Sequence, residues 1–127
     1  MRHLKLLLTG FALLLMGQAV LAHHSTRGLY DESVELELTG TVKEWRFINP
    51  HPSLILSVVD QNGVAHDWDI SYGGAAVVHL QNRGYTADTF KPGDVIVVKG
   101  RPALVKDAYG LLMEGSNPTR VDGTPVP

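Results

Sequence analysis

The sequence predicts a small, mainly β domain that closes into a barrel and carries one short helix. Residues 34–38, Val-Glu-Leu-Glu-Leu, alternate strictly between apolar and acidic side chains, which is typical of a half-buried strand. Residues 60–63 end in Asn-Gly, the pair best suited to the positive φ angles of a tight hairpin. Residues 75–82 place apolar side chains at helical spacing, and Gly84 follows where a glycine commonly ends a helix.

The remaining elements follow from the same periodicities and from the turn residues between them. The expected strands are 34–38 continued by 41–47 after a bulge or sharp bend at Gly40, then 54–59, 64–70, 95–98, and a final hairpin of 104–105 with 111–113. The order of three strands, a helix and two strands matches a five-stranded OB-like barrel with the helix between strands 3 and 4. A β-sandwich with a helical insertion is the alternative.

The chain divides into three expected parts. Residues 1–22 read as a signal peptide, 23–115 as one β-barrel domain with an N-terminal arm, and 116–127 as a loose C-terminal tail. The tail assignment follows from its prolines and its low apolar content. The 105 residues that remain after removal of the first 22 suffice for one small core and are too few for two.

The signal peptide prediction depends on three consecutive features of the N-terminus. Arg2 and Lys5 form a basic region, residues 6–16 form an apolar region, and Val20-Leu21-Ala22 ends in the small residue that a signal peptidase requires. The apolar region is short for a membrane-spanning helix. We therefore expect a periplasmic or secreted protein without a membrane anchor after cleavage.

Charge and cysteine content exclude several classes of protein. Removing Arg2 and Lys5 from the 11 basic residues leaves 9 against 13 acidic ones, a formal charge of −4. An acidic domain without a basic stripe is a poor nucleic-acid binder, because phosphates require clustered Lys and Arg. The sequence contains no cysteine, which excludes disulfides, thiolate metal sites and a cysteine nucleophile.

Cleavage after Ala22 would make His23 the first residue of the mature protein. Its free amine and its imidazole Nδ1 can then chelate one metal ion, and a second imidazole completes a planar set of three nitrogens. Such a set suits Cu(II), with Zn(II) or Ni(II) as weaker alternatives. His51 is the expected partner because two prolines stiffen its loop, and His24 either assists or lies nearby. His66 and His79 are expected to be structural or surface residues.

Two aromatic residues support a different function, a non-metal binding module of the cell envelope. Trp45 and Trp68 could hold a small ligand, a peptide or an envelope partner on one barrel face. A third hypothesis is a hydrolase that uses Asp67 or Asp69. Two acids on the outer face of a strand are more commonly solvated surface residues. No phosphate loop, nucleophile elbow or zinc-protease motif occurs, so no catalytic residue is assigned.

Several short motifs occur in an order that resembles a known family. They are His23-His24-Ser25, Tyr30-Asp31, Leu38 to Val42, Trp45, Asn49-Pro50-His51, Trp68 and Lys91-Pro92-Gly93-Asp94. The chain resembles a family of small exported bacterial proteins of unknown function, whose mature chains often begin His-His-Ser and carry an Asn-Pro-His motif. This resemblance implies export and a barrel fold, and it implies no established activity.

Overall fold

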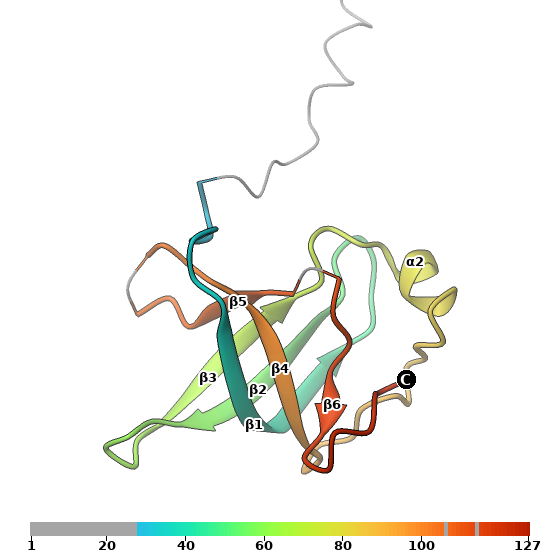
Figure 1. Cartoon of the computed structure of the whole chain (residues 1–127). Coiled ribbons are helices and arrows are strands. Elements are labelled where there is room, and N and C mark those ends of the chain that lie inside the picture. The colour runs from blue at the N-terminus through green and yellow to red at the C-terminus, as the bar shows by residue number, and fades with distance from the viewer. Residues whose placement is uncertain (1–27, 106, 114) are drawn as a thin grey trace, which may run out of the picture.

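In the part of the chain that the computed structural model describes, five strands form a closed barrel, and a sixth short strand and one helix lie against it (Figure 1). The structure describes residues 28–105, 107–113 and 115–127; the expected signal peptide, His23 and His24 lie outside them. The strands are β1 (Leu36–Arg46), β2 (Ser53–Val59), β3 (Ala65–Ser71), β4 (Val95–Pro102), β5 (Gly110–Leu112) and β6 (Thr119–Arg120), and the helix is α2 (Val77–Gln81).

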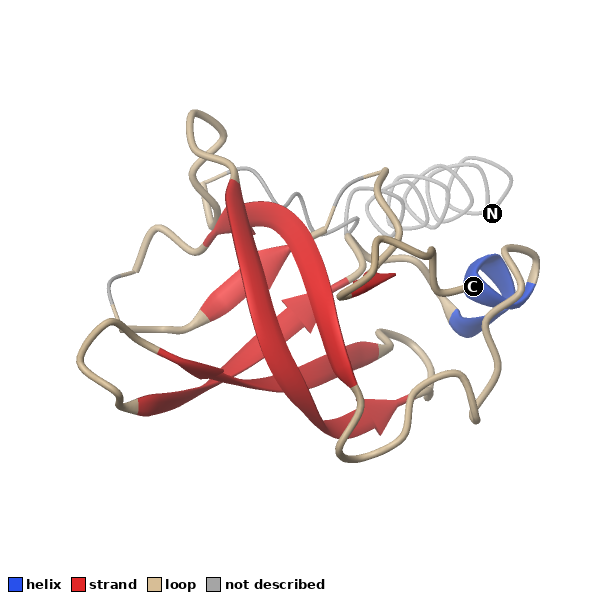
Figure 2. Cartoon of the chain, turned by 60° about the horizontal axis from the view of Figure 1, so that its bottom comes forward, coloured by secondary structure: helices blue, strands red, loops and turns tan. Residues whose placement is uncertain are grey.

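The barrel closes because the long strand β1 pairs with two partners. Its C-terminal half is antiparallel to β2 and its N-terminal half is antiparallel to β4, and Thr41 is paired with Ser57 on one side and Val95 on the other. The remaining pairs are β2–β3 and β4–β5, both antiparallel, and β3–β5, which is parallel. The OB-like prediction, with one helix between the third and fourth strands, is therefore confirmed (Figure 2).

Gly40 lies where β1 passes from one partner strand to the other. A Cβ atom on Gly40 would lie 2.9 Å from Val58 Cγ2 and 3.0 Å from the Ser57 carbonyl oxygen, so only glycine fits without displacement. Of the two alternatives expected at Gly40, a bulge or a sharp bend, the bulge is not at this residue, because the β1–β2 register shifts between Val42 and Glu44. A glycine is thus needed at position 40 because β2 approaches its backbone closely. It is not the extra residue of a bulge.

The core combines the inward side chains of the strands with residues from the segments that cover one end. Leu54, Leu56 and Ile70 are fully buried inside the barrel, as the alternating pattern predicts. Leu80 of α2 is also fully buried, so the helix plugs the barrel end at which β3 finishes and β4 begins. Val34, expected to point inward, lies outside β1 and is 39% exposed.

The C-terminal segment 116–127 is not the loose tail that its composition suggested. Its strand β6 pairs with Ile96 and Val97 of β4, and its Val126 is only 5% exposed. The Val126 amide donates to the Pro118 carbonyl at 2.8 Å, which folds the segment back on itself. The prediction was wrong because a few well-placed apolar residues anchor a segment whose average composition is polar. The last expected hairpin also differs, since Leu104 and Val105 lie in a loop.

Candidate binding groove on the outer face of β2 and β3

A groove of about 490 Å³ runs across the outer face of the barrel. Its floor is formed by outward side chains of β2 and β3, including Ser53, Asp69 and Ser71, beside Gly110 of β5. Two loops flank the floor, the β1–β2 loop with His51 and the β4–β5 loop with Val105 and Ala108. In OB-type barrels this face and these two loops form the usual ligand site.

His51 projects from the loop between β1 and β2 at one side of this groove. Pro52 is buried, and the Asn49 side-chain oxygen accepts a hydrogen bond of 3.1 Å from the Val77 amide at the start of α2. The Asn49–Pro50 peptide bond is cis. The imidazole of His51 is exposed and forms no hydrogen bond or ion pair with any residue that the structure describes. Its nitrogens are therefore available to a ligand.

The described N-terminal segment contributes a further part of the groove lining. Leu29 and Tyr30 both line the groove. The Leu29 carbonyl accepts a hydrogen bond of 2.9 Å from the Leu104 amide, and Tyr30 forms an isolated antiparallel bridge with Ala103. The Asp31 amide donates to the Pro102 carbonyl at 2.8 Å. Residues 29–31 of the predicted N-terminal arm are thereby fixed to the end of β4 and the loop that follows it.

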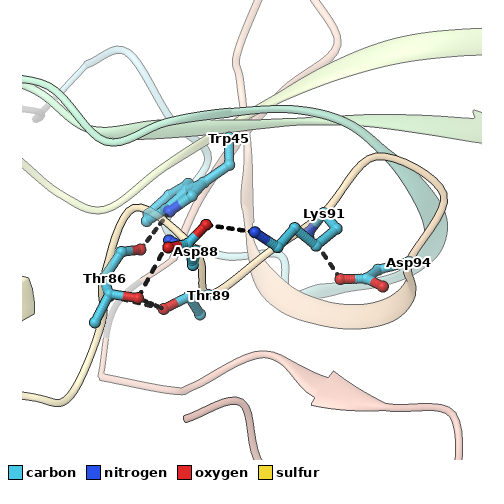
Figure 3. A network of polar contacts seen from close by, with 6 residues as sticks. All are labelled: Trp45, Thr86, Asp88, Thr89, Lys91 and Asp94. Carbon is cyan, nitrogen blue, oxygen red and sulfur yellow. Dashed lines mark hydrogen bonds and ion pairs between the residues drawn. The ribbon is translucent and has the colours of Figure 1, made fainter.

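Trp45 lies elsewhere, in an aromatic cluster beneath the helix. Its ring centroid is 5.1 Å from that of Phe90 and 5.6 Å from that of Tyr72. Its indole Nε1 donates a hydrogen bond of 2.8 Å to the Thr86 carbonyl, within a polar network that continues to Asp88 and Lys91 (Figure 3). The contacts of Trp45 are those of a core residue.

The neighbouring Tyr72 carries a buried hydroxyl with no hydrogen-bond partner among the described residues. Burial raises the pKa of the Tyr72 phenol well above its ordinary value. The phenol therefore stays neutral at physiological pH.

Trp68 faces a different hollow, at the barrel end opposite α2, together with His66 and Tyr109. The interpretation as a ligand-binding module places both tryptophans on one barrel face. In the structure Trp45 lies in the aromatic cluster and Trp68 lines this hollow. Trp45, which follows the bulge between Val42 and Glu44, pairs with Leu54 near the start of β2. Trp68 pairs with Leu56, nearer the other end of the same strand.

The remaining candidate residues occupy three separate environments. Asp67 forms an exposed ion pair of 2.6 Å with Lys43, whereas Asp69 lines the groove. His79 Nδ1 accepts a hydrogen bond of 3.2 Å from the Ala76 amide at the start of α2. This is the local structural role expected of that histidine.

Among the residues that the structure describes, no three histidines or carboxylates gather into a metal-binding cluster. The groove contributes one imidazole and one carboxylate, His51 and Asp69. Sequence reasoning identified His51 but missed Tyr30, Ser71 and Asp69 as groove residues. The only available signal for Asp69 was its outward position on a strand of the usual OB ligand face.

The fold is a small closed barrel of OB-like topology, and a groove lies on the outer face of β2 and β3. In the part of the chain that the structure describes, no helix is long and apolar enough to span a bilayer. The chain belongs to a family of unknown function, DUF6152, whose model matches residues 12–112. No curated protein and no solved structure gives a significant match.

Proposed function

We propose that the mature protein is an exported barrel that binds Cu(II) in the groove beside His51. The ligands are the amine and imidazole of a processed His23 N-terminus and the imidazole of His51, with His24 assisting. The observation that carries this proposal is the shared location of Leu29, Tyr30 and His51 along one groove. Leu29 and Tyr30 of the predicted N-terminal arm therefore line the same groove as His51, the intended partner of His23.

The length of the arm agrees with this arrangement. His23 precedes Leu29 by six residues, and an extended chain spans at most about 20 Å over that length. Because Leu29 and His51 line one groove, we expect an arm of this length to fold back and place its terminus over His51. The tether formed by Leu29, Tyr30 and Asp31 also reduces the entropy that ordering the arm would cost.

The chemistry of the groove favours a cation bound by nitrogen. The His51 imidazole is exposed and unpaired within the described residues, and the Asp69 carboxylate adds negative charge to the groove floor. An amine and two imidazoles form a nitrogen set that Cu(II) binds in a tetragonal geometry. The role that fits a small exported barrel is sequestration, delivery or sensing of copper, and we assign no catalytic residues.

The proposal is tested by titrating Cu(II) into the mature protein with an authentic His23 terminus. Three variants are compared with it: one extra residue before His23, His51→Ala, and His79→Gln as the control, a histidine of α2 that does not line the groove. The extension and the His51→Ala change should each weaken binding at least about tenfold, because each removes a direct ligand. His79→Gln should bind as the unchanged protein does. Electron paramagnetic resonance should report nitrogen ligation that the extension alters.

Export is tested separately by mass spectrometry of the protein recovered from the periplasm. The expected N-terminal residue is His23. A processed terminus at another position, or equal copper affinity with and without the extra residue, would overturn the copper proposal.

A further inference from the structure

We propose that the barrel mouth opposite α2 is a second binding site, which takes a small organic cation with an apolar body. The mouth contains a hollow of about 530 Å³, within the range usual for small-molecule sites. Its inner walls are Leu38, Val58 and Trp68, with Tyr109, His66 and Asp60 around them. This site is independent of the proposed copper groove, because the two hollows share no lining residue.

Aromatic rings form one wall of the hollow. Tyr109 stacks on His66 with ring centroids 4.3 Å apart and an angle of 15° between the planes. The same tyrosine meets Trp68 edge to face, with centroids 5.6 Å apart. The indole N–H of Trp68 makes no hydrogen bond with any described residue. A ligand that enters the mouth therefore meets aromatic surface and one free donor.

Tyr109 is held in this position by a backbone that tyrosine rarely adopts. Its φ angle is +43°, and that of Asp107 in the same loop is +66°. The Tyr109 carbonyl accepts a hydrogen bond of 2.9 Å from the Asp69 amide, which fixes the residue against β3. Bulky residues at positive φ are uncommon, and such conformations concentrate at ligand sites, where the surrounding fold maintains them.

The charges around the hollow are negative or locally paired. The Asp60 carboxylate accepts hydrogen bonds of 2.8 Å from the Asn62 and Val64 amides and lies 3.2 Å from His66 Nε2. These contacts, with the Val64 amide as the largest cause, lower the pKa of Asp60 and keep it ionised at neutral pH. Glu37 also lines the hollow and pairs with Lys99 at 2.9 Å.

The class of ligand follows from this combination of rings and acids. No lysine or arginine is among the residues that line the hollow, so nothing in the described walls favours an anion. Aromatic faces beside a carboxylate attract organic cations, quaternary ammonium groups in particular. Leu38 and Val58 provide apolar contact for the uncharged part of such a molecule.

The probe for this site is benzyltrimethylammonium, compared with neutral benzyl alcohol and anionic benzenesulfonate. Nitrogen-15 NMR of the mature protein resolves the two indole N–H groups, which Trp→Phe variants assign. The cation should shift the Trp68 signal and leave that of Trp45 in place. Tyr109→Gly removes the ring while allowing the positive φ, and Asp60→Asn removes the charge while retaining an acceptor oxygen. Each change should weaken binding by about 2- to 30-fold.

His51→Ala is the matched control, because it alters the groove and leaves the barrel mouth unchanged. It should bind the cation as the unchanged protein does. Equal binding of the anion, a shift confined to Trp45, or unchanged affinity in a folded Tyr109→Gly variant would each overturn the proposal. So would the absence of any shift with the cation at millimolar concentration.

Discussion

Tyr30 and His51 line the same groove although they belong to segments on opposite sides of strand β1 in the sequence. Tyr30 reaches the groove because its segment is bonded to the loop after β4, and His51 reaches it from the loop before β2. This relationship places the start of the barrel domain beside a free imidazole. The proposed copper site depends on it, and the first two predictions test its consequences.

Copper affinity should fall as the pH falls. An N-terminal amine binds metal only after losing its proton, and its reference pKa is about 7.7–8. Below that range protons compete with Cu(II) for the amine, so the apparent affinity should drop by up to about tenfold per pH unit. Titrations between pH 8 and pH 6 measure this slope. A variant with one residue added before His23 should show a different pH dependence, and identical curves would contradict amine ligation.

Leu104→Pro should weaken copper binding without unfolding the barrel. The substitution removes the amide that donates to the Leu29 carbonyl, and this bond tethers the arm beside the groove. Leu104→Ala is the matched control, because it shortens the same side chain and retains the amide that donates to Leu29. Calorimetric titration with Cu(II) measures the difference between the two variants. Equal affinities would show that the tether does not position the arm.

Gly40→Ala should destabilise the protein by about 1–3 kcal/mol, as overpacking of a tight site commonly does. The new methyl group would press on Val58 and on the Ser57 carbonyl, and the backbone atom cannot move aside easily. Urea unfolding followed by circular dichroism gives the free energy of unfolding. Thr39→Ala, at a nearby exposed position of β1, should change that free energy little. A Gly40→Ala variant as stable as the original would contradict the close approach.

Removal of residues 125–127 should lower the free energy of unfolding by about 1.5–3 kcal/mol, the value of burying one valine. Val126 is 5% exposed and its amide donates to Pro118, so the truncation takes away a buried apolar contact and a backbone hydrogen bond. Val121→Ala, at a position 67% exposed, serves as the control. Thermal and urea unfolding measure both. A truncated protein of full stability would restore the loose-tail interpretation.

Asp60→Asn should reduce the loss of stability in acid. Hydrogen bonds from the Val64 and Asn62 amides and from His66 lower the folded-state pKa of Asp60 below its ordinary value of 3.8. The ionised carboxylate therefore stabilises the folded state above about pH 4, and this contribution is lost as the pH falls through the lowered pKa. Urea unfolding from pH 6 to pH 2 should show a shallower decline for the variant. If the free energy of unfolding declined equally in both proteins, Asp60 would contribute nothing to the pH dependence of stability.

The barrel was predictable because its strands carry strong local signals. The alternation around Leu36 and Leu38, the Asn-Gly turn and the helix stop at Gly84 each specify backbone geometry within a few residues. The C-terminal segment was not predictable in this way. Its anchoring depends on Val126 and on pairing with β4, and such long-range contacts leave no periodic pattern in a short segment.

The candidate site likewise combines features that local sequence predicts with features that only the tertiary structure shows. The sequence by itself determined that His51 sits in a proline-stiffened loop and that the acids of β3 alternate outward, because both follow from local chain geometry. Only the tertiary structure decided that Tyr30 and Asp69 share the groove with His51, and that Trp45 and Trp68 lie apart. Barrel closure brings distant segments together, and it depends on strand register and a bulge whose effect no single segment encodes.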